Sequence, residues 1–204
     1  PPAIPANLIA DYAAGGMQAA IGILAALMAR ERTGKGQYVD IAMCDGVVSL
    51  MHMLATGYFS TGEVPQRGSD MLTGGIPNYN VYETKDGKYI SIGSLEPWFD
   101  QSLCRALGRE DFIPYEFDEG KNEEVSSYFR ETFLTKTRDE WFELLKQTDI
   151  CAAPVYSLDE VFSDPHVLHR KMVVEADDPK YGKVRQVGIS VNFIQLHMHQ
   201  SSLA

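Results

Sequence analysis

The sequence predicts a mixed α and β protein built from two subdomains. Two observations lead to this prediction: a long apolar helix comes early in the chain, and a unit with a β-hairpin and several helices follows later. The chain has 204 residues, 45% of them apolar and 23% charged, which is the makeup of a globular protein able to bury a sizeable core.

The first part of the chain is expected to hold two apolar helices with a strand between them. Residues 7–32 predict a buried helix because their apolar positions mostly recur at steps of three and four, and a glycine of the following TGKG stretch suits its C-terminal cap. These apolar positions are Leu8, Met17, Ile21, Leu24, Leu27 and Met28. Residues 37–43 alternate and predict a strand, and a second helix is expected from Asp45 to about Tyr58.

The second part opens on a predicted β-hairpin. Residues 78–95 form two alternating runs separated by a Lys-Asp-Gly turn at 85–87, a pattern typical of a hairpin. A helix should then begin at Pro97, a residue suited to a first helical turn, and extend to Leu107, with Gly108 closing it.

Further helices and strands are expected beyond this hairpin. Thr137-x-x-Glu140 and Ser157-x-x-Glu160 have the spacing of a capping box, so a helix should begin after each hydroxyl residue. The other expected elements are helices at about 122–135 and 138–148, a strand at 153–157, and two strands within 172–193 around a turn at 179–182.

Composition excludes several classes of function. The formal net charge of -10 argues against a surface for nucleic acid or for an anionic membrane. The three cysteines form no CxxC pair and the five histidines follow no ligand spacing, so neither a disulfide framework nor a metal site is expected. The apolar run within 17–29 is too short to span a bilayer, and no leader pattern opens the chain. We therefore expect a cytoplasmic protein that does not contact a membrane.

Asp11 stands where the apolar helix begins. A carboxylate there ordinarily caps the helix by accepting bonds from main-chain N–H groups. The same position also suits chemistry, because helix-end N–H groups beside an acid can hold an oxyanion on a bound carbonyl while the carboxylate moves a proton or attacks. The residues alone leave both interpretations open.

Five other positions are candidates for a binding site. Glu96 follows the predicted hairpin and precedes a helix, so it is either a cap or a site residue. Gly74 and Gly75, close before Tyr79, form either a simple turn or a place where the backbone approaches a ligand. Met43 belongs to the core or an interface, or to an adaptable wall around an acyl group.

Four stretches, taken in order, resemble the family III CoA-transferases, the CaiB/BaiF group that includes a racemase branch acting on α-methylacyl-CoA. The resemblance covers nearly the whole chain. The four stretches are NLIADYAAGGMQAAIGILAAL, RERTGKGQYVDIAMCDG, GGIPNYNVYETKDGKYISIGSLEPWF and DPHVLHRKMVVEADDPKYGKVRQVG.

The resemblance implies roles for two acids. The catalytic Asp of the family's [GA]D motif matches Asp11, and the active-site acid of the [IL]EPxF motif of the racemase branch matches Glu96, 85 residues further on. The family's transferases tend to carry a longer glycine run where this chain has only Gly74 and Gly75, which favours the racemase branch.

The resemblance also implies a reaction, racemisation or epimerisation at the α-carbon of a 2-methylacyl-CoA thioester. One base removes the α-proton, an enolate forms, and another group returns a proton to the opposite face. Asp11 would be one acid/base, and its N–H could help hold the enolate oxygen. The opposing His of the family lies upstream of this stretch, and none of the five histidines here matches it. Coenzyme A enters only as part of the acyl-CoA substrate, and no other cofactor is implied.

The fold implied by the resemblance is α/β: part of a Rossmann-like large domain plus a small α+β domain with a β-hairpin, in the interlocked dimer of the family. Family members are about twice this long, so the chain is expected to be a C-terminal half without the CoA adenine pocket. The expected division is 1–45 for the end of the large domain, 46–75 for a linker helix and loop, 76–170 for the small domain, and 171–204 for a return segment. An interlocked homodimer is expected of the full-length protein.

Two alternatives stay open. In CoA transfer between carboxylic acids, Asp11 would act as a nucleophile through a mixed anhydride and an aspartyl-CoA thioester. In the other, the chain is an inactive fragment or a non-catalytic folding module. Weak or no activity is expected of the isolated chain in any case.

Overall fold

A computed structural model describes residues 3–191 and divides the chain into two compact units, Pro1–Asp70 (unit 1) and Met71–Ala204 (unit 2). Helices and antiparallel strands are both present, as the sequence predicts. The finer division into four segments stays a prediction, and residues 192–204 of its last segment lie outside the described residues.

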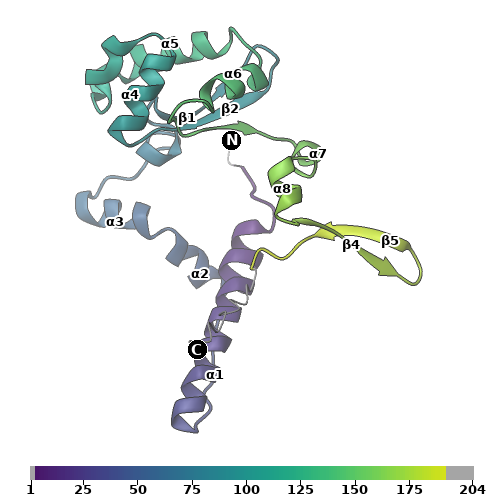
Figure 1. The fold of residues 1–204 in the computed structure, drawn as a ribbon. Helices are drawn as coiled ribbons and strands as arrows, with labels where there is room; N and C mark the ends of the chain where they lie inside the picture. The colour runs from purple at the N-terminus through teal and green to yellow at the C-terminus, as the bar shows by residue number, and fades with distance from the viewer. Residues whose placement is uncertain (1–2, 192–204) are drawn as a thin grey trace, which may run out of the picture. The chain divides into compact units, whose positions relative to one another are not determined.

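Unit 1 is helical. One continuous helix consists of η1 (Leu8–Met17), a π-helix with bonds from each N–H to the carbonyl five residues earlier, and α1 (Gln18–Thr33) (Figure 1). Gly34 ends this helix with a φ of +70°, a left-handed conformation that glycine adopts without strain. Two shorter helices follow, α2 (Met43–Leu50) and α3 (His52–Thr61).

The prediction that the first helix is buried is wrong for unit 1 as described. Ile21 and Leu24 are 59% and 62% exposed, and among residues 3–70 only Ala14 is buried. The reason is that α2 packs on η1 and leaves most of the apolar surface of α1 uncovered. A regular amphipathic pattern fixes the helix, but burial of its apolar face needs another element to cover it.

Two local predictions in unit 1 also differ. Residues 37–43 do not form a strand, because a strand needs a paired neighbour and the described part of unit 1 offers none. Instead the side chains of Val39 and Ile41 lie against Gly22 of α1. The second helix is interrupted at Met51, whose φ of -83° and ψ of 8° lie outside the helical range, so α2 and α3 replace the single helix expected.

The helix Leu8–Thr33 is longer than the apolar run 17–29 considered in the sequence. Its 26 residues, with a mean hydropathy of 1.5 over an 18-residue window, meet the length and composition of a membrane-spanning helix. The core helix of a soluble protein meets the same criterion, so this property alone carries no argument for a membrane.

Unit 2 contains a three-stranded antiparallel sheet in the order β1-β2-β3, with strands β1 (Tyr79–Glu83), β2 (Tyr89–Gly93) and β3 (Ala152–Val155). The predicted hairpin is confirmed as β1–β2, with Tyr82 opposite Ile90. The strand predicted at 153–157 is confirmed as β3, which starts one residue earlier and ends two residues earlier than predicted.

The helices predicted for unit 2 are confirmed, and so are both capping boxes. The helices are α4 (Pro97–Ala106), α5 (Asn122–Phe133), α6 (Arg138–Leu145), α7 (Leu158–Val161) and α8 (Pro165–His169), with 3₁₀ turns η2 (Met71–Thr73), η3 (Glu110–Tyr115) and η4 (Glu119–Lys121). The sequence did not predict α8 or the 3₁₀ turns. The second predicted pair of strands is confirmed as the hairpin of β4 (Val173–Asp178) and β5 (Gly182–Val187).

Alternation along the strands gives the sheet two different faces. Tyr82, Ile90 and Ile92 are almost fully buried and form one core with residues of the helices, among them Phe133 and Leu145. Figure 1 shows α4, α5 and α6 gathered beside this sheet. Because successive side chains point to opposite faces, the residues between these buried positions lie on the face away from the core.

An ion pair between a buried arginine and a half-buried glutamate fixes the path of the chain as it leaves the sheet. Arg138, 2% exposed, donates to both carboxylate oxygens of Glu160 at 2.7 and 2.9 Å and to the Val155 carbonyl oxygen at 3.1 Å. Bonds from Arg138 and then from Lys88 hold the pKa of Glu160 well below its usual range. The start of α6, the end of β3 and α7 are therefore tied together.

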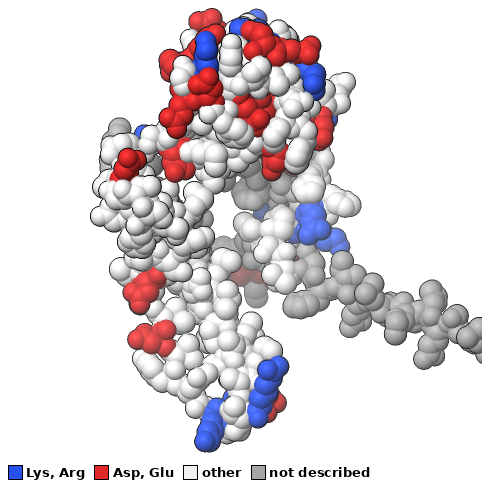
Figure 2. Space-filling model, turned by 90° about the vertical axis from the view of Figure 1, so that its left-hand side faces the viewer, with Lys and Arg blue, Asp and Glu red and all other residues white. Residues whose placement is uncertain are grey.

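Acidic side chains are spread over unit 2, whereas the surface of unit 1 is largely uncharged in the space-filling view (Figure 2). The apolar surface described above for α1 accounts for part of this uncharged area.

Candidate active site

The open face of the sheet in unit 2 carries a pocket of about 650 Å³. It lies on the side away from the core, so the residues between the buried strand positions form much of its wall. The lining residues are Leu72, Thr73, Gly74, Tyr79, Asn80, Val81, Ser91, Ile92, Gly93, Cys151, Ala152 and Ala153. The wall is mainly apolar, which suits an acyl chain better than a charged ligand.

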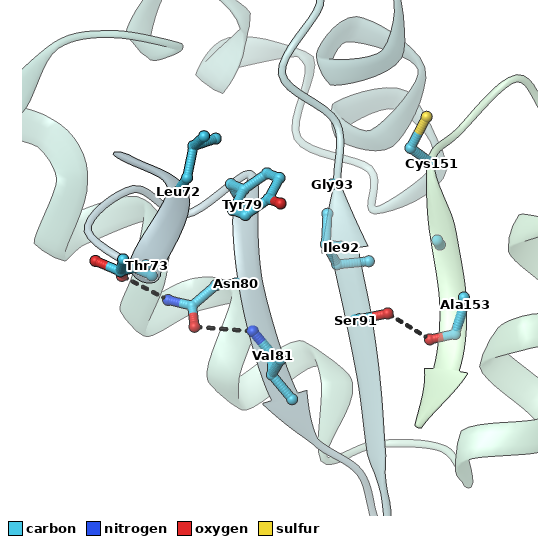
Figure 3. Close-up of a pocket in the computed structure, with 12 residues that line it drawn as sticks. Leu72, Thr73, Tyr79, Asn80, Val81, Ser91, Ile92, Gly93, Cys151 and Ala153 are labelled. Carbon is cyan, nitrogen blue, oxygen red and sulfur yellow. Dashed lines mark hydrogen bonds between the residues drawn. The ribbon is translucent and has the colours of Figure 1, made fainter. Parts of the chain in front are cut away.

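Gly74 and Tyr79, two residues predicted to bind substrate, both line this pocket. Gly74 has a φ of +98°, and a Cβ atom at this position would lie 3.1 Å from the Asn80 Oδ1 atom. The Asn80 side chain in turn donates to the Gly74 carbonyl oxygen at 2.9 Å, which holds the turn against β1 (Figure 3). Gly75 does not line the pocket; its carbonyl oxygen accepts a long bond of 3.5 Å from Asn122.

Gly93, at the end of β2, lies between the side chains of two other pocket residues, Tyr79 and Cys151. The Tyr79 ring and the Cys151 Cβ atom lie 3.7 and 4.0 Å from where a Cβ atom on Gly93 would be. Figure 3 shows these two side chains on either side of the strand end. A larger residue at position 93 would therefore narrow this end of the pocket.

Glu96 follows this strand end by three residues. It is exposed and occupies the N-cap position of α4 with an extended backbone, but its side chain makes no capping hydrogen bond. Burial, and then the charges of Glu96 and Asp149, raise the pKa of the Cys151 thiol. The carboxylate of Glu96 is thus within electrostatic range of a residue that lines the pocket.

Asp11 lies in the first part of the π-helix of unit 1. It is exposed, and the N-terminus of that helix has no side-chain cap, so the structure does not support the capping interpretation. The bonds of the π-helix begin with the Tyr12 N–H donating to the Asn7 carbonyl oxygen at 3.1 Å, so the N–H of Asp11 belongs to the turn before them. Stretches of π-helix are rare and often occur at functional sites.

Met43 lies against the same helix, one turn after Asp11. Its Cγ atom is 3.0 Å from where a Cβ atom on Gly15 would be, so a glycine allows this contact. Asp11 and Met43 thus lie on or against the same helix of unit 1, while in unit 2 Gly74 and Tyr79 line one pocket and Glu96 follows the strand that forms its wall. Among residues 3–191, no three His, Cys, Asp or Glu side chains are placed to hold a metal ion together.

Sequence reasoning missed several residues of the pocket wall. Those with reactive or polar side chains are Thr73, Asn80, Ser91 and Cys151. Ser91 had a usable signal, because it lies between two apolar positions of an alternating run and must face away from the core. Cys151 had none, because its place beside Gly93 depends on the pairing of β2 with β3, strands separated by three helices.

Comparison with known proteins places the chain in a family. The sequence profile of CoA-transferase family III matches residues 1–204, and the chain belongs to this family. The α-methylacyl-CoA racemase of Homo sapiens is 37% identical over 179 residues, which are 87% of this chain and 47% of that protein. The succinyl-CoA–D-citramalate CoA-transferase of Chloroflexus aurantiacus is 28% identical over 177 residues, 84% of this chain and 44% of that protein. The chain thus spans about half the length of the curated relatives it matches.

Solved structures confirm the α/β fold of the family. A CaiB/BaiF family protein from Brucella suis superimposes with a TM-score of 0.69 at 26% identity, over 95% of this chain and 50% of that one. Rv3272 from Mycobacterium tuberculosis gives a TM-score of 0.77 at 22% identity, over 96% of this chain and 52% of that one.

Proposed function

We propose that the full-length protein racemises or epimerises the α-carbon of a 2-methylacyl-CoA thioester. The observation that carries the proposal is the position of Glu96: an exposed carboxylate without a capping role, just beyond the strand that forms an apolar pocket of acyl-chain size. The racemase among the relatives is a further support, while the transferases among them keep the alternative reaction testable.

The reaction moves one proton off the α-carbon and one back. A base takes the α-proton, the C–H electron pair moves into the thioester carbonyl to give an enolate, and an acid then protonates the carbon from the opposite face. We assign Asp11 to one of these proton transfers, and the N–H groups at the start of its helix to the enolate oxygen. We assign Glu96 the role implied by the resemblance to the racemase branch: an active-site acid paired with the upstream His that serves as the opposing base.

Substrate contacts are assigned to four further residues. Tyr79 and the turn at Gly74 and Gly75 would contact the acyl part, and Met43 would form an adaptable wall near Asp11. Coenzyme A comes with the substrate, and no other cofactor is needed for this chemistry. We also propose a cytoplasmic location, and a homodimer in which the two subunits interlock.

The experiment is exchange of the α-hydrogen for deuterium in heavy water, followed by NMR or mass spectrometry of the acyl-CoA. The full-length protein should catalyse exchange, and Asp11→Asn should reduce the rate by about 100-fold or more, the usual contribution of a positioned acid or base. Glu96→Gln should lose exchange. Its matched control is Glu83→Gln, which changes an exposed carboxylate on β1 and should leave the exchange rate unchanged. No exchange with any of several 2-methylacyl-CoAs would refute the proposal.

Two further outcomes separate the alternatives. Hydroxylamine trapping of an aspartyl-CoA thioester at Asp11, without α-exchange, would establish CoA transfer instead. The isolated 204-residue chain should show weak or no turnover, because it spans about half of its relatives; measurable turnover by the purified chain would contradict this expectation.

A further inference from the structure

A small cavity lies in the core of unit 2, between the segment just before β1, α4, η3 with the residue that follows it, and α5. Its volume is about 10 Å³, close to the space that one water molecule needs. Most of its wall is aromatic or aliphatic, but five residues with polar or ionisable side chains also line it: Asn78, Asp100, Cys104, Tyr115 and Glu116.

Two acceptors in this cluster lack partners among the described residues. Asn78 is 2% exposed and donates from Nδ2 to the Ser94 carbonyl oxygen at 2.9 Å, but its Oδ1 atom is buried without a hydrogen bond. The Oε1 atom of Glu116 is also buried without one. A buried acceptor without a partner is costly, so such a pair facing one cavity points to a bound donor.

Counting donors and acceptors identifies what the cavity holds. Asp100, 4% exposed, adds a second carboxyl group, which has two partners: the Cys104 thiol at 3.8 Å from Oδ2, and the Asn78 side chain. A water molecule supplies two donors, which match the two unpartnered acceptors, Asn78 Oδ1 and Glu116 Oε1. The two carboxyl groups line one cavity without a cation among its lining residues, so one proton on the pair removes one of two like charges.

We propose that Asn78, Asp100 and Glu116 bind one internal water molecule together with one proton, and that this site positions Glu96. The chain on both sides of Glu96 is tied to the cluster. The Ser94 N–H donates to the Asn78 carbonyl oxygen at 2.8 Å, and the Asp100 N–H donates to the Glu96 carbonyl oxygen at 3.1 Å. Asp100 is therefore a positioning residue; its effect on the reaction rests on the function proposed for Glu96.

The groups around the cavity determine the pH range over which the carboxyl pair of Asp100 and Glu116 keeps its proton. Burial, and then the charge of Glu116, raise the pKa of Asp100 to about 6, and burial raises the pKa of Glu116. Cys104 shares helix α4 with Asp100, and its pKa is raised to about 12, so the thiol stays neutral. The remaining polar residues that line the cavity are Tyr115 and Asn78, and its lining residues include no Lys, Arg or His. The pair should lose its proton as the pH rises through about 6.

The experiment compares Asp100→Asn, which mimics the protonated acid, with Asp100→Leu and with the surface control Asp177→Asn in the full-length protein. Urea unfolding is measured from pH 4 to pH 7. Relative to Asp100→Asn, the unfolding equilibrium constant of the wild type and of Asp177→Asn should rise by about 100-fold over this range, as a shift of about two pKa units requires. Asp100→Leu should be destabilised at every pH, because it leaves Asn78 and Glu116 unpaired.

Three further results separate this inference from the proposed function. A high-resolution crystal structure at pH 5 should contain a water molecule bonded to Asn78 and Glu116. Glu96→Gln should lose α-exchange but keep the wild-type pH dependence of unfolding. Asp100→Asn should keep α-exchange at pH 5. When the pH is raised to 7, the α-exchange rate of Asp100→Asn should fall less than that of the wild type. An empty cavity, or the same pH dependence of unfolding in the wild type and in Asp100→Asn, would overturn the inference whether or not the protein is a racemase.

Discussion

Replacing Tyr82 by Phe should test how much a hydrogen bond from the core stabilises the loop before β1, residues 74–78. The Tyr82 hydroxyl donates to the Pro77 carbonyl oxygen at 2.6 Å, and the residue is only 2% exposed. Tyr82→Phe keeps the ring stacked on Phe133, whose centroid is 5.0 Å away, and removes only the hydroxyl. The carbonyl of Pro77 is then left without this donor, which should lower the free energy of unfolding by about 1–2 kcal/mol.

Urea unfolding, followed by circular dichroism, measures this loss as a lower midpoint with an unchanged slope. Tyr89→Phe is the matched control, because Tyr89 lies on the neighbouring strand of the same hairpin and is 44% exposed; its stability should change little. Hydrogen exchange of the Tyr79 amide, which bonds to the Ile76 carbonyl oxygen within the same loop, should become faster in Tyr82→Phe alone. Equal stability of the two variants would refute the reasoning.

Two other changes probe the helices. Gly46→Ala should destabilise unit 1 by about 2 kcal/mol or more, because the new Cβ atom would lie 2.5 Å from the Ala14 carbonyl oxygen. Gly57→Ala, with open space around it, is the control and should be neutral or mildly stabilising. Equal urea midpoints for the two variants would contradict this contact. Thr137→Ala removes the hydroxyl of the capping box with Glu140 and should cost about 1 kcal/mol by the same measurement; an unchanged midpoint would show that the cap contributes nothing.

Most of unit 2 could be predicted from local sequence because its signals are local. The turn at 85–87 and the two capping boxes act within a few residues, and the structure contains each of them. In unit 1 the same reasoning predicted the helix correctly but wrongly predicted that its apolar face is buried. Alternation at residues 37–43 predicts a strand only if another strand pairs with it, and the described part of this unit supplies none.

The candidate site could be predicted only in part. Asp11 and Glu96 were found through a family resemblance, and their positions at a helix start and a strand exit agree with the local sequence. Cys151 and the internal cluster around Asp100 depend on segments that are distant in the chain. Nothing near Asp100 in the sequence marks it as buried beside Glu116, so this carboxyl pair needed the folded structure.

The two faces of the sheet have separate consequences for how such proteins diversify. Val81, Ser91 and Ala153 contribute to the pocket wall but not to the buried core, so their side chains can change in size or polarity without unpacking the helices. Evolution can therefore alter what the pocket accepts while the domain remains stable. Ile90 and Tyr82, one position away on the same strands, do not have this freedom.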